Sequence, residues 1–191
     1  MAQVSLERLI SAAQTGNLVS FPTDTVPALA TLPQCAELIF RTKQRSQNKP
    51  LILMAGRVED LWQFTRGSSG DLAIWQAVAE RYLPGALTLV LPASARVPAV
   101  MNPLGNQTIG LRVPAHPVAQ EILLQVGAMA TTSANLSGQS PLLTMADISA
   151  AFPQVFALDV ETAGSPSQPS TVVRWSDSGW ELLRQGAITL D

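Results

Sequence analysis

The chain has 191 residues, of which 47% are apolar, so it can bury a large core and is too apolar for a disordered segment. Only 14% of the residues are charged and the formal net charge is −2, so no global basic field marks a binder of nucleic acid or anionic membrane. With one cysteine and one histidine, Cys35 and His116, the chain cannot form an intramolecular disulfide and has too few soft ligands for a structural zinc site.

The first third of the chain predicts two helices and two strands. Ser5 can cap a helix whose apolar residues recur at a spacing of three and four, and Gly16 can end it. A β-rich run follows at residues 18–23. The pattern then predicts a second helix over residues 34–42 and a buried strand over residues 51–56.

The rest of the chain continues the alternation of helices and strands. Helical spacing occurs at 69–85, ending at Pro84-Gly85, at 117–127 and near 144–151. Strands are expected at 86–93, 170–175 and 179–188, and also within 108–117, where the strand runs into a Pro-ended turn, and within 128–141, where it enters a polar loop. Such an order indicates an α/β fold with a partly parallel sheet. We find no repeat and no domain boundary, so we expect a single domain over residues 1–191, with 164–170 as a surface loop.

Nothing in the sequence predicts a targeting or membrane segment. Residues 1–16 mix acidic and basic side chains into the apolar pattern, which argues against the apolar core of a signal peptide. No window reaches the roughly 18 consecutive apolar residues of a membrane span. We therefore expect a cytoplasmic protein without membrane association, and a single cysteine fits that reducing compartment.

Three cations lie within seven residues, in the stretch TKQRSQNKP. In an extended loop, Lys43 and Arg45 would point the same way, and both could bind one polyanion. Lys49 follows four residues later. The alternative is a solvated helix end, where cations complement the helix dipole. The glycine-rich phosphate loops GxxxxGK[ST] and GxGxxG are absent, so a bound nucleotide would need these side chains instead.

Other polar residues stand at the ends of apolar runs. Thr23-Asp24-Thr25 follows a hydrophobic run, and the hydroxyl-rich segment 131–138 follows another; each also fits an ordinary turn or loop. Arg112 and Arg184 are set in apolar strands, which indicates a solvent-facing position or an anionic partner. His116 has no GxSxG motif beside it and is expected to be structural.

Seven segments, in this order along the chain, resemble the signature blocks of the YrdC/Sua5/TsaC family: FPTDTV, KQRSQNKPL, PGALTLVL, GLRVPAHP, TTSANLSG, PSTVV and LLRQGAI. The resemblance extends from about residue 5 to 188, and the shared order is more specific than any single block. It implies a single-domain α/β fold, with a twisted open mixed sheet flanked by helices and a concave, positively charged cavity.

The resemblance also implies an activity. Members of the family are threonylcarbamoyl-AMP synthases, nucleotidyltransferases that join L-threonine, bicarbonate and ATP into threonylcarbamoyl-AMP and pyrophosphate. This reaction begins the N6-threonylcarbamoyladenosine modification of tRNA, so partner proteins of that pathway are implied as well. Mg²⁺ is expected to accompany the triphosphate without a dedicated protein site.

The matching motifs carry the family's site residues onto this chain. The residues expected to bind ATP are Lys43, Arg45, Lys49, Thr108, Ser133, Asn135 and Arg184, and among these Lys43 and Arg45 are expected to support catalysis. The residues expected to bind threonine are Thr25, Arg112, Thr131 and Ser170. Arg112 is the natural partner of the threonine carboxylate.

One segment departs from the family pattern. The family usually has an aromatic residue and a glycine after PT[DE]xV, whereas this chain has Val26-Pro27-Ala28, and the stretch from Thr25 to Arg45 is about three residues shorter. Proline removes a backbone donor and alanine disfavours positive φ. Two alternatives to the synthase stay open: a divergent paralogue with altered or lost threonine specificity, and an RNA-binding module that uses the basic cavity for weak contact with RNA.

Overall fold

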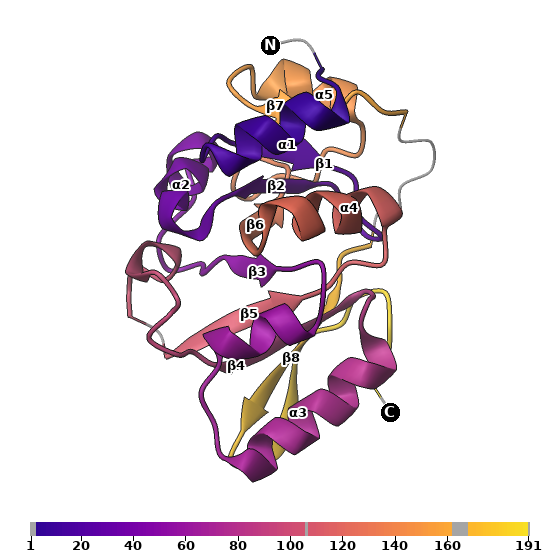
Figure 1. Ribbon diagram of the computed structural model, residues 1–191. Helices are drawn as coiled ribbons and strands as arrows, with labels where there is room; N and C mark the ends of the chain where they lie inside the picture. Colours follow the sequence, from indigo (N-terminus) through magenta and orange to yellow (C-terminus); the bar gives the residue numbers. More distant parts are fainter. Residues whose placement is uncertain (1–2, 106, 162–167, 191) are drawn as a thin grey trace.

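The strands form one mixed sheet in a computed structural model that describes residues 3–105, 107–161 and 168–190 (Figure 1). Their order across the sheet is β7-β1-β2-β6-β3-β5-β4-β8-β9. The neighbours β7/β1, β3/β5 and β4/β8 are parallel and the other neighbours are antiparallel. The strand bounds are β1 Val19–Phe21, β2 Ala28–Thr31, β3 Ile52–Met54, β4 Leu87–Pro92, β5 Thr108–Arg112, β6 Met129–Ser133, β7 Phe156–Ala157, β8 Thr171–Ser176 and β9 Gly179–Arg184.

The helices begin where the sequence supplies caps. Ser5 accepts a hydrogen bond from the Arg8 amide, and Ser68 forms a reciprocal capping box with Asp71. The α-helices are α1 Leu6–Gln14, α2 Glu37–Lys43, α3 Ser69–Tyr82, α4 Pro117–Val126 and α5 Met145–Ala151, and short 3₁₀ turns cover η1 Pro33–Cys35, η2 Glu59–Phe64 and η3 Ala99–Met101. In Figure 1, α1 and α5 lie at the top beside β7, and α3 lies at the bottom beside β8.

Strand alternation divides the two faces of the sheet between core and site. In β5, Ile109 and Leu111 are buried in the hydrophobic core, which also contains Trp75 of α3 and Ile122 of α4. The intervening β5 residues face the other side. That second face carries the cavity described below, so the same pleat that builds the core also presents polar side chains to a ligand.

Most predicted elements are confirmed, and so is the mixed α/β fold class. The exceptions are local. The helix predicted over residues 34–42 begins only at Glu37, because η1 forms first. The sequence pattern missed the short strands β2 and β7. The expected loop 164–170 lies largely outside the described residues, and the expectation of one domain over residues 1–191 stays a prediction.

Within the described ranges, no helix combines the length and the apolar character needed to span a bilayer.

Candidate active site

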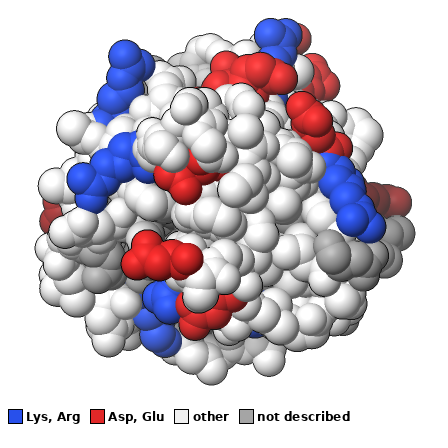
Figure 2. Space-filling model, turned by 90° about the horizontal axis from the view of Figure 1, so that it is seen from below, with Lys and Arg blue, Asp and Glu red and all other residues white. Residues whose placement is uncertain are grey.

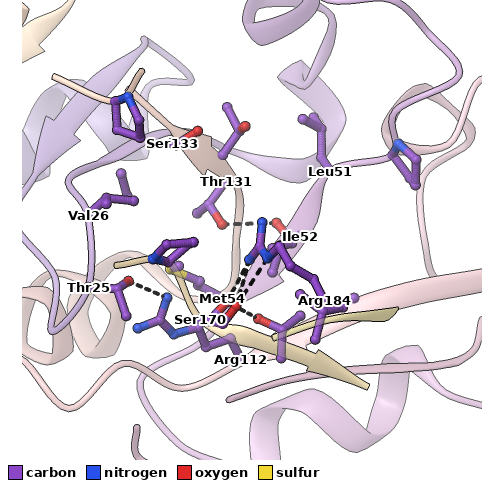
Figure 3. Close-up of a pocket in the computed structure, with 18 of the residues that line it drawn as sticks. Thr25, Val26, Leu51, Ile52, Met54, Arg112, Thr131, Ser133, Ser170 and Arg184 are labelled. Carbon is purple, nitrogen blue, oxygen red and sulfur yellow. Dashed lines mark hydrogen bonds between the residues drawn. The ribbon is translucent and has the colours of Figure 1, made fainter. Parts of the chain in front are cut away.

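A cavity of about 510 Å³ lies on one face of the sheet (Figure 3). Alternate residues of neighbouring strands form its floor, as the two-residue period of a strand requires. β5 contributes Thr108, Gly110 and Arg112, and β3 contributes Ile52 and Met54. Residues of β2, β4, β6, β8 and β9 complete the lining. The floor is therefore built on regular strands, which fix the positions of the side chains that it presents.

Four arginines line this cavity: Arg45, Arg112, Arg174 and Arg184. Among the described lining residues there is no aspartate or glutamate. Arg174 at the rim pairs with Glu181 of β9 at 2.7 Å, and both side chains are about half exposed. The cavity thus gathers cationic side chains from segments far apart in the sequence, which suits an anionic ligand.

Arg112 is held at the end of β5 by three separate bonds. Its Nη2 lies 2.7 Å from Asp24 Oδ1, its Nη1 donates to Thr25 Oγ1 at 2.8 Å, and its Nε donates to the Gly85 carbonyl at 3.1 Å. Burial lowers the pKa of Arg112, while the Asp24 carboxylate acts in the opposite direction and Arg184 adds to the lowering. A guanidinium remains charged despite such shifts, so Arg112 is a rigid, fixed cation.

Arg184 forms the facing cationic group, from the end of β9. Its Nη2 donates to the Ser170 carbonyl at 2.8 Å and to Ser170 Oγ at 3.2 Å. Ser170 Oγ lies 2.9 Å from Thr88 Oγ1. Burial lowers the pKa of Arg184. Figure 3 shows Arg184 reaching Ser170 while Arg112 reaches Thr25, so the two arginines are anchored to different sides of the cavity.

Hydroxyl and amide groups form a third wall, at the end of β6. Thr131 Oγ1 donates to the Ile52 carbonyl at 3.1 Å, and Ser133 Oγ donates to Asn135 Oδ1 at 2.6 Å. The Asn135 amide nitrogen donates to the carbonyls of Leu136 and Gln139, both at 2.8 Å. These bonds hold the loop after β6 in one shape, with Ser133 and Asn135 facing the cavity.

The cationic stretch begins at a helix end, one of the two arrangements that the sequence left open, and is not extended at Lys43. Lys43 is the last residue of α2 and is 1% exposed, and Gln44 adopts the left-handed conformation that ends the helix. Arg45 then lines the cavity, with its guanidinium held by the carbonyls of Lys49 and Pro50 at 2.9 and 3.0 Å. A helix end therefore separates the two cations, and Arg45 lines the cavity whereas Lys43 does not.

Burial shifts the titration of both groups. The pKa of Lys43 is lowered to about 7, chiefly by desolvation and secondarily by the charge of Arg45. Burial also lowers the pKa of Arg45.

Nine of the eleven expected site residues line one cavity: Thr25, Arg45, Thr108, Arg112, Thr131, Ser133, Asn135, Ser170 and Arg184. The other two are Lys43, which lies behind the wall, and Lys49, whose side chain is exposed on the loop after Arg45. The sequence reasoning missed Thr88, Gly110 and Arg174. These three could have been found from strand alternation. Each lies on the same face of the sheet as an expected residue of its own strand or of a paired strand.

The segment Val26-Pro27-Ala28, which differs from the family pattern, forms part of the cavity wall. Ala28 opens β2 and pairs with Ser133 of β6, and the Pro27 carbonyl accepts the Ala134 amide at 3.1 Å. Among the described residues other than glycine, Gln44 alone has a positive φ. Ala28 is therefore unstrained, and the departure alters the composition of the wall without distorting its backbone.

His116 does not form a nucleophile–base pair in the described hydrogen bonds. It stands at the N-cap position of α4, and its buried Nδ1 has no hydrogen-bond partner there. Burial lowers the pKa of His116, with Asp24 acting in the opposite direction. The described part of the chain also has no group of three or more His, Cys, Asp or Glu arranged to hold a metal ion.

Comparison with known proteins identifies the family. Residues 11–186 match the Sua5/YciO/YrdC family model, described as "Telomere recombination". A threonylcarbamoyl-AMP synthase of Vibrio vulnificus is 32% identical over 95% of this chain and 98% of its own length. The Bos taurus threonylcarbamoyl-AMP synthase is 31% identical over 95% of this chain and 68% of its own length.

A solved structure agrees with these sequence matches. The P. abyssi Sua5 structure complexed with L-threonine superposes with a TM-score of 0.83 at 28% identity, over 97% of this chain and 56% of that one. The chain thus spans little more than half the length of that archaeal protein. With most of its length matched by the family model and by a full-length bacterial relative, the chain belongs to the Sua5/YciO/YrdC family.

Proposed function

We propose that the protein is a threonylcarbamoyl-AMP synthase, which joins L-threonine, bicarbonate and ATP into threonylcarbamoyl-AMP and pyrophosphate. Relatives with this name match nearly the whole chain, including a bacterial one over 98% of its length. The observation that carries the proposal is the convergence of Arg45, Arg112 and Arg184 on one cavity with hydroxyl-rich walls. ATP and bicarbonate are anions and L-threonine carries a carboxylate, so a shared cationic site can hold these substrates close enough to react.

The threonine end of the site is assigned to Arg112 with Thr25, Thr131 and Ser170. The bonds of Arg112 to described residues engage three of the five N–H groups of its guanidinium, which leaves two for a carboxylate. Asp24 fixes the plane of the guanidinium, so these two donors point in a set direction. The archaeal Sua5 complexed with L-threonine supports placing an amino acid in a site of this fold.

The ATP end is assigned to Arg45 and Arg184, with Thr108, Ser133 and Asn135 as polar contacts. The two arginines would neutralise phosphate oxygens, and the hydroxyl and amide groups would fix the orientation of the nucleotide. Lys49 would reach a phosphate only if its exposed side chain turned toward the cavity. These assignments divide the cavity into an amino-acid end and a nucleotide end.

Mg²⁺ is proposed to arrive with the triphosphate. The described residues that line the cavity offer hydroxyl and amide oxygens but no carboxylate. That donor set fits an ion that takes its ligands mainly from phosphates and water, as Mg²⁺ commonly does. When bound, the ion would neutralise phosphate charge, and no protein side chain is assigned as its ligand.

The chemistry needs placement more than a protein nucleophile. The threonine amine attacks the carbon of bicarbonate, and loss of water gives a carbamate. A carbamate oxygen then attacks the α-phosphorus, and the bond from that phosphorus to the bridging oxygen breaks as pyrophosphate leaves. Arg112 would hold the amino acid in line, while Arg45 and Arg184 would stabilise charge on the phosphates.

The test is pyrophosphate release in the presence of ATP, bicarbonate and L-threonine. The proposal predicts release only when all three are present. ATP binding without any threonine-dependent release would contradict it and favour a divergent paralogue, for which the altered Val26-Pro27-Ala28 wall is the motivating feature. Other amino acids tested in place of threonine would then identify the substrate of such a paralogue.

An RNA-binding module is the less favoured reading. The face shown in Figure 2 carries scattered cationic and acidic groups separated by uncharged surface, and no continuous basic stripe crosses it. RNA binders usually combine such a stripe with stacking aromatics. Tight, strongly salt-dependent RNA binding in the absence of ATP would be needed to favour this function. Contact with partner proteins of tRNA modification remains a proposal that follows from the assigned reaction.

A further inference from the structure

Lys43 is buried behind the wall of the cavity, with 1% of its surface exposed. Its ammonium donates to Asn135 Oδ1 at 3.0 Å and to the Ser133 carbonyl. No described carboxylate lies within ion-pair distance of it, and the charged group that acts on it is Arg45, a like charge. A buried lysine without a counter-ion is costly, so this position calls for a physical reason.

Lys43 ties helix α2 to the loop after β6 at three points. The side chain makes the two bonds to Ser133 and Asn135, and the Lys43 carbonyl accepts the Ser137 amide at 3.1 Å. On the cavity side of the same loop, Ser133 Oγ shares the Asn135 Oδ1 acceptor. The orientation of the Asn135 amide, and with it the polar wall, therefore depends on the Lys43 ammonium.

We propose that Lys43 is a positioning residue: it holds Ser133 and Asn135 from behind in the arrangement that receives an anionic nucleotide, and it does not itself touch the phosphates. This inference rests on the proposed function for the identity of the ligand, whereas the contacts of Lys43 with Ser133 and Asn135 are independent of that function. It replaces the expected direct role of Lys43 in phosphate binding with an indirect one through Asn135.

The missing counter-ion is consistent with this role. An ammonium has three donors and no acceptor, and the acceptors that Lys43 finds at the end of β6 and in the loop after it, Ser133 and Asn135, are neutral. A polyanion bound beyond the wall would stabilise the charged form of Lys43 through space. The pKa of Lys43 in the free protein is lowered to about 7, so near neutral pH only part of the protein carries a protonated Lys43. Binding of a polyanion would therefore be accompanied by protonation of this amine.

A double-mutant cycle tests the indirect role. Lys43→Met, Asn135→Ala and the double variant are compared with the unchanged protein for ATP binding by calorimetry. If Lys43 acts through Asn135, each single change weakens binding about tenfold and the double change is no worse than the stronger single change. Fully additive losses would show an independent phosphate contact and overturn the proposal. Arg41→Met, an exposed cation of the same helix, serves as the matched control and should change affinity less than about twofold.

The same cycle measured as free energy of unfolding needs no ligand. Strong coupling between the two positions supports the contact, and independent effects overturn it, whether or not the protein makes threonylcarbamoyl-AMP. An unchanged protein that binds ATP but forms no product would thus refute the proposed reaction and leave this inference standing.

A measurement on the unchanged protein covers the case in which Lys43→Met does not fold. The sequence has only two lysines, Lys43 and Lys49, so acylation by an amine reagent can be followed site by site with mass spectrometry. Lys49 should react quickly, and Lys43 should react slowly both with and without ATP. Rapid labelling of Lys43 that ATP suppresses would place its amine in the cavity and overturn the proposal.

Discussion

Arg112 and Asp24, 88 residues apart in sequence, form an ion pair with 2.7 Å between Nη2 and Oδ1. The arginine side chain is 4% exposed and the aspartate side chain is 17% exposed. The pair joins the end of β5 to the turn after β1, and the same guanidinium also binds Thr25 of that turn. One buried cation therefore fixes both the turn and the proposed amino-acid end of the cavity.

Replacing Asp24 with asparagine removes the only carboxylate that pairs with Arg112 in the described structure. Because the cation is then buried without a counter-charge, we expect the free energy of unfolding to fall by about 2 kcal/mol. Urea denaturation followed by tryptophan fluorescence measures this. Glu181→Gln breaks the exposed pair with Arg174 and should cost less than about 1 kcal/mol. Equal losses in the two variants would contradict the structural role of the Asp24 pair.

Substitutions at the two proposed ends of the cavity should affect the affinities for ATP and for threonine differently. Arg45→Ala removes a guanidinium from the nucleotide end, so ATP affinity should fall at least about tenfold while threonine affinity stays within about twofold. Arg112→Ala should do the reverse, since it removes the proposed partner of the threonine carboxylate. Calorimetric titration of each variant with each ligand gives four values. Equal losses of both ligands in both variants would be inconsistent with the division of the site.

Lys43 should make stability depend on pH. Its folded pKa of about 7 lies below the ordinary lysine value of 10.5, so above pH 7 the folded protein loses a proton that the unfolded chain keeps. Stability should therefore rise from about pH 7 to 10.5, by at most about 1.4 kcal/mol per pH unit, and this group adds no pH dependence below pH 7. The measurement is the difference in unfolding free energy between the unchanged protein and Lys43→Met across that range.

Nuclear magnetic resonance can check the same titration directly. A protein labelled with carbon-13 at lysine Cε gives two lysine signals. One signal, that of Lys43, should titrate near pH 7. If neither signal titrates near pH 7, the buried, uncompensated ammonium is ruled out.

Gly110 is one of the β5 residues that line the cavity floor. A Cβ there would approach Ile52 Cγ1 at 3.3 Å and Thr88 Cγ2 at 3.4 Å, contacts that small side-chain shifts can absorb. Gly110→Val should therefore change the unfolding free energy by less than about 1 kcal/mol but weaken nucleotide binding about tenfold, because its methyl groups enter the cavity. Gly70→Val, on the exposed first turn of α3, is the control. Unchanged ATP affinity in Gly110→Val would show that the nucleotide lies elsewhere.

The sequence predicted the elements whose pattern is local. The cap at Ser5 and the apolar periods of α1 and α4 can be read without tertiary information, and α1 begins directly after Ser5. β2 escaped prediction because all four of its residues are small or apolar and fully buried, which removes the alternation that marks a half-exposed strand. β7 has only two residues, too few for any periodic signal.

Site residues that belong to a recognisable motif could be predicted from the sequence. Site residues that reach the cavity only through the pairing register of the strands could not. Thr108 and Arg112 were expected, but Gly110 between them was not, since its importance comes from its position against Ile52 of β3 and Val90 of β4. The position of Lys43 depended on where α2 ends. A helix that reaches Lys43 turns this side chain back toward the core, whereas an extended loop would have pointed it with Arg45.

Bicarbonate labelled with carbon-13, supplied together with ATP and L-threonine, shows whether the protein makes threonylcarbamoyl-AMP. Mass spectrometry of the nucleotide products should show threonylcarbamoyl-AMP that carries the label, formed in step with pyrophosphate and absent when threonine is omitted. An adenylate that lacks the labelled carbon, or pyrophosphate released at the same rate without threonine, would contradict the assignment of this cavity to threonylcarbamoyl-AMP synthesis.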